Sequence, residues 1–268
     1  MLCLVTVLQR DFGVFAIQKL NHYPDCSNSE DLFLHGILRG HGGTCSSLPV
    51  LYASVGRRLG YPLKLARAAY HLFARWDDPG GDRFNIECTA LGLEIPPDEF
   101  YSTWPAIPDP EDARAGYVFK SMAPREELAG FLVQRAYCLL HNNRHQAAVE
   151  SCIGATMAAP GNKCHEQSTV LMMRHWQARL RQLHPPGFPK LFIHPPARRR
   201  FPSRLPFQLE QDFLTFQVME ELLNDSEKQR RWWQPLLQSS QQWPTEIPTC
   251  IEISVNQDYL FGLERSPS

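Results

Sequence analysis

One cysteine of this chain lies in a context that favours nucleophilic chemistry. Cys45 follows Gly42, Gly43 and Thr44, and an apolar segment with helical spacing begins directly after it. The positive end of a helix dipole favours a thiolate over a thiol. Backbone N–H groups in the glycine-containing loop are expected to face a developing oxyanion. These residues predict a cysteine nucleophile, with oxyanion or loop support from the three residues before it.

A cysteine nucleophile needs a base, and the base needs a group that orients it. His71 lies in a segment rich in apolar and aromatic residues, and Glu87 lies in the next such segment. The residues DDPGGD between them are a strong turn signal. We therefore predict a pair of antiparallel strands over 63–76 and 83–89, with His71 as the base and Glu87 as the orienting acid.

The register of this strand pair decides which residue orients the base. With Pro79 at the centre of the turn, His71 lies opposite Glu87, and Phe73 lies opposite Asn85. A carboxylate beside the imidazole would hold its tautomer and stabilise the imidazolium. Asn85 remains the alternative orienter, because an amide also serves this role in cysteine enzymes.

Three motifs resemble the transglutaminase-like branch of the papain-like cysteine enzymes, and bacterial SirB-type proteins in particular. They are GGTCSSLPVLYASVGRRLGYP, AAYHLFARWD and RFNIECT. The resemblance covers residues 32–160 and implies an α+β fold, with a helix packed on an antiparallel sheet. By position it implies Cys45 as nucleophile, His71 as base and Glu87 as the acid, where true transglutaminases usually carry Asp. Many SirB-type proteins lack the cysteine, so its presence in this chain favours activity.

The elements that position these residues can also be predicted. Residues 1–40 have the pattern of short helical segments. The next helix should begin close to Cys45–Leu48, because Pro49 is tolerated only in a first turn, and it should end near Gly60. Arg75 is expected on the same strand face as His71 and near the cleft. His41, beside the glycines, is a second possible base.

From Pro124 onward the apolar period becomes helical, and Pro and carboxylates occupy the first turn. Residues 129–162 resemble a tetratricopeptide repeat, and another helix is expected over about 165–183. The small or apolar positions of this repeat, and its terminal proline, are Leu132, Ala136, Leu139, Ala148, Cys152, Ala155 and Pro160. Because one repeat cannot bury its own apolar face, we expect it to pack directly on the core.

These patterns divide the chain into four regions. They are a transglutaminase-like core (1–115), a tetratricopeptide-like helical region (120–183), a Pro-rich linker (184–206) and a C-terminal helix and tail (207–268). The linker contains an arginine cluster, for which a stiff extended arm is the preferred interpretation.

Composition excludes several classes of function. The chain has 268 residues, 43% of them hydrophobic, and a net charge of -1, so it can build a core but lacks the basic excess of a nucleic-acid protein. No apolar run is long enough to cross a bilayer, and the N-terminal segment lacks signal-peptide flanks. We expect a cytoplasmic protein that binds neither nucleic acid nor membranes. The eight cysteines and the histidines show no ligand spacing, so neither a metal nor a cofactor is expected.

Two functions from different classes remain open. The first is cysteine-dependent acyl transfer or amide hydrolysis, as in a protease, an amidase or a transglutaminase-like enzyme acting on a peptide or protein substrate. The alternative is a catalytically inactive scaffold that binds a protein or peptide through its helical repeat. Selective labelling of Cys45 by a thiol-directed electrophile separates the two.

Overall fold

The computed structural model describes residues 1–17 and 25–183, and this part of the chain is α+β. In chain order, its helices and strands are α1 (Leu2–Thr6), η1 (Val7–Asp11), α2 (Ser29–Leu32), α3 (Leu34–Leu38), α4 (Leu48–Arg58), β1 (Leu63–Ala68), β2 (His71–Asp77), β3 (Arg83–Ile86), α5 (Asp98–Tyr101), α6 (Pro110–Arg114), α7 (Pro124–His141), α8 (His145–Ala158) and α9 (Lys163–Leu183). The predicted linker over 184–206 and the helix and tail over 207–268 lie outside the described residues.

The three strands form one antiparallel sheet in the order β1-β2-β3. The prediction of a single strand over 63–76 is wrong, because the chain reverses at Ala69 and Tyr70, so that Ala68 pairs with His71. Tyr70 has a φ of 59°, in the left-handed region that bulky residues seldom occupy. The turn contains no Gly or Asn that would mark it in the sequence. The apolar and aromatic pattern of residues 63–76 therefore continues through the turn without a break.

The hairpin between β2 and β3 has a longer turn than the one predicted. Asp77 pairs with Arg83, so the turn is centred on Gly80 and not on Pro79. The predicted register is therefore wrong by two residues. Because side chains alternate with a period of two along a strand, an error of two residues leaves each side chain on the predicted face. His71 and Glu87 consequently still face the same side of the sheet and meet along a diagonal.

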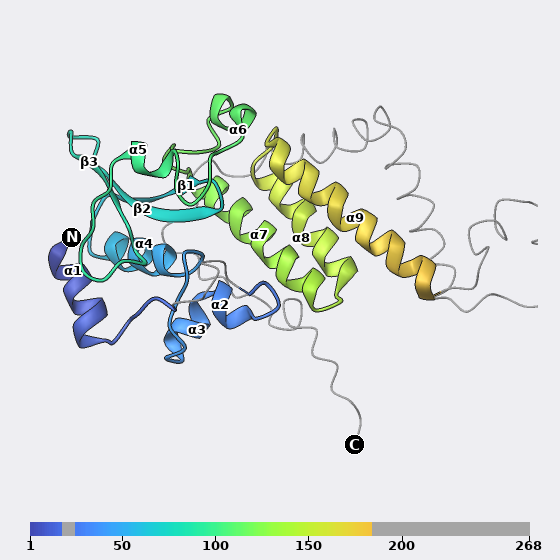
Figure 1. Ribbon diagram of the computed structural model, residues 1–268, viewed down its shortest axis with the longest axis horizontal. Helices are drawn as coiled ribbons and strands as arrows, with labels where there is room; N and C mark the ends of the chain where they lie inside the picture. Colours follow the sequence, from blue (N-terminus) through green and yellow to red (C-terminus); the bar gives the residue numbers. More distant parts are fainter. Residues whose placement is uncertain (18–24, 184–268) are drawn as a thin grey trace, which may run out of the picture.

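Helix α4 covers one face of the sheet (Figure 1). The helix begins at Leu48, as predicted, with Pro49 in its first turn. Its buried residues pack against apolar residues of the strands, and a Cβ on Gly56 would come within 2.3 Å of Leu63 Cδ1. This close approach fixes how far the helix lies from β1. The core between the two layers includes Leu48, Tyr52, Ala53, Leu63, Leu65, Ala74 and Ile86.

Helices α7, α8 and α9 lie side by side and form a separate layer at one end of the sheet (Figure 1). The turn between α7 and α8 uses Asn143 with a φ of 59°, a conformation that Asn tolerates. Small buried side chains let the helices approach closely, among them Ala129, Ala136, Ala148, Cys152 and Ala155. In the described part of the chain, no helix is long and apolar enough to cross a bilayer.

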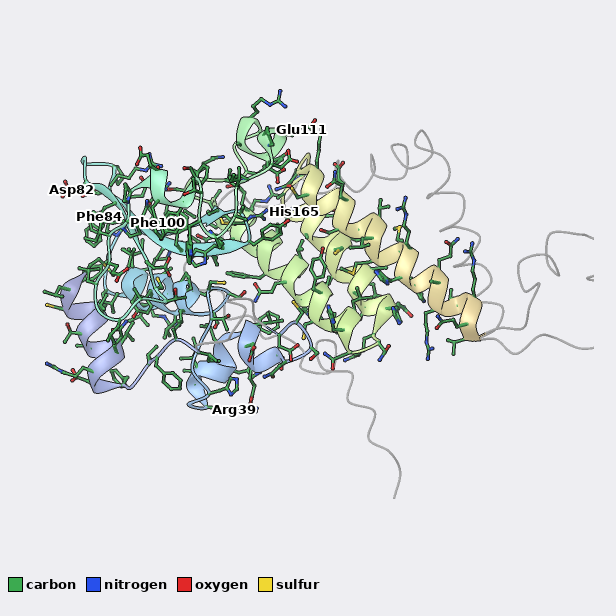
Figure 2. All side chains as sticks on the ribbon, in the orientation of Figure 1. Arg39, Asp82, Phe84, Phe100, Glu111 and His165 are labelled. Atoms are coloured by element: carbon green, nitrogen blue, oxygen red, sulfur yellow. The ribbon has the colours of Figure 1, made fainter. Side chains whose placement is uncertain are left out.

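The helical layer packs directly on the core, as predicted for a repeat that cannot bury its own apolar face. Glu127 at the start of α7 is buried and binds the Arg57 guanidinium of α4 with two hydrogen bonds of 2.9 and 2.5 Å. The same carboxylate accepts the backbone N–H of Leu65 on β1. Further along α7, Gln134 donates to the carbonyl of Leu32. Figure 2 shows His165 of α9 at this junction between the layers.

Candidate active site

Cys45 lies in the turn that leads into α4, three residues before the helix begins. Its side chain is 9% exposed. Hydrogen bonds hold the approach to this turn, because Thr44 Oγ1 donates to the carbonyl of Asp31 at 2.7 Å and the Thr44 N–H donates to Ser47 Oγ at 3.1 Å. The thiol is therefore fixed near the positive end of α4.

Gly42, Gly43 and Thr44 support this loop, but two of their N–H groups are not free for an oxyanion. The Gly43 N–H donates to the carbonyl of Phe15 at 2.9 Å, and the Thr44 N–H is bound to a side chain. Gly42 has a φ of 88°, and a Cβ there would come within 2.6 Å of the Phe15 ring. The prediction that the N–H groups of Gly43 and Thr44 face an oxyanion is therefore wrong. The Gly43 N–H binds the N-terminal segment, and the Thr44 N–H binds Ser47.

The backbone N–H of Cys45 is, with that of Gly42, a donor of this loop that stays available. Within residues 1–17 and 25–183 it makes no hydrogen bond, whereas the Ser46 N–H donates to Thr44 Oγ1. An N–H on the nucleophilic residue lies beside any oxyanion that forms on the attacked carbon.

His71 and Glu87 form a buried ion pair next to the thiol. His71 Nε2 lies 2.8 Å from Glu87 Oε2, and the two side chains are 4% and 7% exposed. Because Nε2 contacts the carboxylate, Nδ1 is the ring nitrogen left for the Cys45 thiol, whose interaction with the imidazole raises the pKa of His71. The structure therefore brings Cys45, His71 and Glu87 together in the predicted order.

Glu87 is held by more donors than the sequence indicated. Tyr101 of α5 donates its hydroxyl to Glu87 Oε2 at 2.9 Å. Thr89 donates both its backbone N–H and its hydroxyl to Oε1, at 2.9 and 2.5 Å. Thr89 lies in the RFNIECT motif and could have been suspected. Tyr101 had no signal beyond its aromatic type, because its role depends on α5 folding back over the sheet.

These contacts shift the pKa values of the pair in opposite directions. Burial alone would lower the pKa of His71, but hydrogen bonds to Cys45 and Glu87 and the Glu87 charge raise it to about 9. Burial would raise the pKa of Glu87, but the hydrogen bond and charge of His71, with the Thr89 bonds, lower it. Both shifts favour an imidazolium beside a carboxylate. Burial and the Glu87 charge raise the pKa of Tyr101, which stays a hydrogen-bond donor.

Aromatic rings enclose the imidazole. The Trp104 ring meets His71 edge-on with centroids 4.7 Å apart, and the Tyr101 ring stacks at 5.8 Å. Tyr101 also stacks on Phe73 at 4.1 Å. These contacts exclude water from the His71–Glu87 pair and restrict how the imidazole can rotate.

Three other residues considered from the sequence lie away from the thiol. Asn85 binds Arg75 Nε at 2.7 Å and does not contact His71, so it is not placed to orient the base. Arg75 is fully buried and pairs with Asp98, so its expected position at the cleft is wrong. His41 contacts a carboxylate of the loop, with Nε2 3.1 Å from Asp31 Oδ1.

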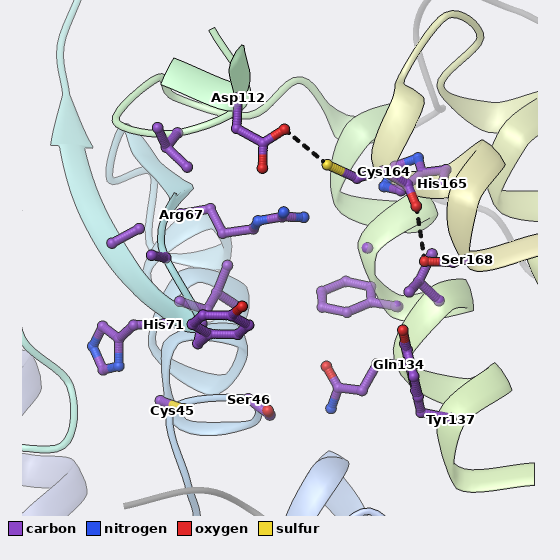
Figure 3. Close-up of a pocket in the computed structure, with 18 of the residues that line it drawn as sticks. Cys45, Ser46, Arg67, His71, Asp112, Gln134, Tyr137, Cys164, His165 and Ser168 are labelled. Carbon is purple, nitrogen blue, oxygen red and sulfur yellow. Dashed lines mark hydrogen bonds between the residues drawn. The ribbon is translucent and has the colours of Figure 1, made fainter. Parts of the chain in front are cut away.

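A cavity of about 600 Å³ opens beside Cys45 and His71, between the sheet and the helical layer (Figure 3). Leu65, Leu72, Val118, Met122, Phe131 and Leu171 make much of its lining apolar. The opposite wall comes from α7 and α9 and includes Gln134 and His165. A molecule in this cavity would therefore lie between the thiol and a surface that the helical layer supplies.

No group of three or more His, Cys, Asp or Glu side chains among the described residues is placed to hold a metal ion. The seven cysteines within the same residues form no disulfides.

Comparison with known proteins adds no relative. No protein-family model, no curated protein and no solved structure matches this chain.

Proposed function

We propose that this protein is a cysteine-dependent acyl-transfer enzyme or amide hydrolase. The observation that carries the proposal is the contact of a buried thiol with an imidazole that is itself bound to a buried carboxylate, beside a cavity. A nucleophile, a base and an orienting acid in this arrangement activate a thiol for attack on a carbonyl.

Each of the three side chains has one task in the reaction. In the thiolate–imidazolium form of the pair, the Cys45 proton is already on His71, and the sulfur forms a bond to the carbonyl carbon of an amide or ester as the carbonyl π electrons move to oxygen. The oxyanion that results is stabilised by the Cys45 N–H. His71 then returns the proton to the leaving amine or alcohol as the bond to the carbon breaks. Water or a second amine then attacks the thioester and gives its proton to His71, and the C–S bond breaks to release the Cys45 thiolate. Glu87 keeps the imidazole oriented throughout.

The fold supports a transglutaminase-like core under this proposal. A helix begins just after the thiol and packs on an antiparallel sheet, with the base at the start of one strand and the acid just after the next. The small buried residues of α7 and α8 support a tetratricopeptide-like pair, because they occupy the positions that such a repeat keeps small. The same helices form a surface through which an inactive scaffold would bind a protein.

Alkylation rates separate the catalytic proposal from the scaffold. At neutral pH, iodoacetamide should modify the buried Cys45 faster than Cys3, which is exposed and serves as an ordinary thiol within the same chain. Cys88 is fully enclosed, and burial raises its pKa well above the ordinary value, so it should react slowest. Peptide mass spectrometry measures all three rates in one sample.

His71→Ala should remove the rate advantage of Cys45 over Cys3. His175→Ala is the matched control, because His175 is exposed on α9 and lies outside the cavity lining. If Cys45 reacts no faster than Cys3, or if both histidine variants behave alike, the pair does not activate the thiol and the scaffold alternative is favoured. If the thiol is activated, an acyl-substrate screen with water or amine acceptors then identifies the reaction.

A further inference from the structure

Arg67 projects into the cavity that contains Cys45. It lies on β1 opposite Leu72, and its side chain points towards Cys164 and His165 of α9 (Figure 3). His71 points to the other side of the sheet, and Cys45 lies at the base of the same cavity. A molecule in the cavity can thus contact the thiol and the guanidinium together.

Arg67 differs from Arg57 and Arg75 in lacking a carboxylate partner among the described residues. Arg57 binds Glu127 and Arg75 binds Asp98, each within 2.5 Å. Among the residues that the structure describes, Arg67 forms no ion pair with a carboxylate; its side-chain partner is the Cys164 thiol. A half-buried guanidinium with so weak a partner retains the capacity to bind an anion.

The groups around Arg67 do not neutralise it. Cys164 donates its thiol to Asp112 Oδ1 at 3.1 Å, and among the described residues no ion pair joins Arg67 to Asp112. Burial, followed by the charge of Arg67, lowers the pKa of His165 to about 4, so His165 is neutral at physiological pH. The His165 side chain is only 3% exposed, and its Nδ1 has no hydrogen-bond partner among the described residues.

The size and lining of the cavity indicate which anion fits. One guanidinium in a largely apolar space matches a single negative charge on an apolar stem. A phosphate dianion would need more positive charge than the one guanidinium supplies. A carboxylate also matches the planar fork of an arginine side chain.

We infer that Arg67 forms a carboxylate-binding subsite, which selects acyl substrates that carry a carboxylate on an apolar stem a short distance from the reacting carbonyl. The assignment of these ligands as substrates rests on the proposed function. The subsite itself rests on Arg67 and the cavity, so the two can fail separately.

Matched charged and neutral alkylating probes test the subsite. The charged probes are bromoacetyl derivatives of glycine, β-alanine, γ-aminobutyrate and ε-aminocaproate, and the neutral probes are the corresponding primary amides. The full chain is treated with each pair, and modification of Cys45 is followed by peptide mass spectrometry. At the best spacer length, the carboxylate probe should react about tenfold faster than its amide, as expected for a charge-assisted hydrogen bond.

Arg67→Gln should remove most of this preference, and Arg67→Lys should keep part of it. The imidazolium of His71 also attracts anions, but that attraction persists in both variants. Arg39→Gln is the control, because Arg39 is exposed and pairs with Glu30. If Arg67→Gln does not fold, the Arg67→Lys ratio and the fall of the wild-type ratio with added salt provide the test.

Two results would overturn the subsite: no spacer gives a wild-type preference for the carboxylate, or Arg67→Gln keeps the full preference. The neutral amides test the proposed function independently. If they modify Cys45 more slowly than Cys3 while the charged preference still depends on Arg67, the subsite stands and the activated thiol does not.

Discussion

Replacing Glu87 with Gln should make the stability of this protein much less dependent on pH above neutrality. The substitution removes the charge that lies 2.8 Å from His71 Nε2 but keeps the size of the side chain. Both partners are buried, so solvent screens their interaction only weakly. The variant therefore isolates the electrostatic part of the pair.

The pKa of His71 gives the size and the sign of the effect. Its value is about 9 in the folded protein, against 6.5 for an ordinary His, so the folded state holds a proton that the unfolded state loses between these pH values. The contribution to the free energy of unfolding is complete below pH 6.5 and is lost as the pH rises through 9. At about 1.4 kcal/mol per pH unit, it amounts to about 3 kcal/mol.

Without the Glu87 charge, the hydrogen bond from Cys45 is left to oppose burial, which lowers the pKa of His71. Most of the contribution should then disappear. The Glu87 carboxylate has a lowered pKa, so its own contribution is lost only as the pH falls below its ordinary range near 4.5. The two effects occupy separate pH windows.

Urea unfolding followed by circular dichroism at pH 6.5 and pH 9 measures the effect. The stability difference between wild type and Glu87→Gln should shrink by about 2 to 3 kcal/mol from the lower pH to the higher. Glu150→Gln, an exposed change on α8, is the control and should leave the wild-type dependence intact. A difference that stays constant across this range would refute the assignment of the raised pKa to the His71–Glu87 pair.

Other predictions follow from the same contacts. Glu87→Gln should slow alkylation of Cys45 by iodoacetamide more than Asn85→Ala does, because only Glu87 contacts the base; the reverse order would mean that the amide acts as the orienter. Glu127→Ala should lower the free energy of unfolding by about 3 kcal/mol in urea titrations, because it leaves Arg57 without its buried carboxylate. A fragment of residues 1–115 should aggregate or melt below the full chain, as measured by light scattering and calorimetry. A soluble, equally stable fragment would show that the helical layer is independent of the core.

The convergence of Cys45, His71 and Glu87 could be predicted even though the register was wrong. Strand side chains repeat every two residues, and the turn was longer than expected by an even number of residues, so the predicted face survived. An odd error would have placed Glu87 on the other face. The prediction that the three side chains converge therefore depended on the order of the motifs in the sequence and not on the exact pairing across the turn.

Other features depended on contacts that no local pattern shows. Arg75 lies on the same strand face as His71, but it is fully buried and pairs with Asp98 at the start of α5. The N–H of Gly43 has the exposed-loop context expected of an oxyanion donor, yet the distant N-terminal segment accepts its hydrogen bond. In the sequence, Glu127 is one of two carboxylates in the first turn of a helix, but in the structure it binds Arg57 of α4. In each case, long-range packing decided the role of a polar group.

The position of the cavity links the two layers of the protein. The thiol comes from the turn before α4 and its base from β2, whereas Gln134, Cys164 and His165 come from α7 and α9 across the cavity. The core therefore positions the reacting groups, and the helical layer supplies much of the surface that a bound molecule would meet. Because the ion pair of Glu127 and Arg57 fixes the start of α7 against the core, a change at this junction should alter binding in the cavity without touching the His71–Glu87 contact.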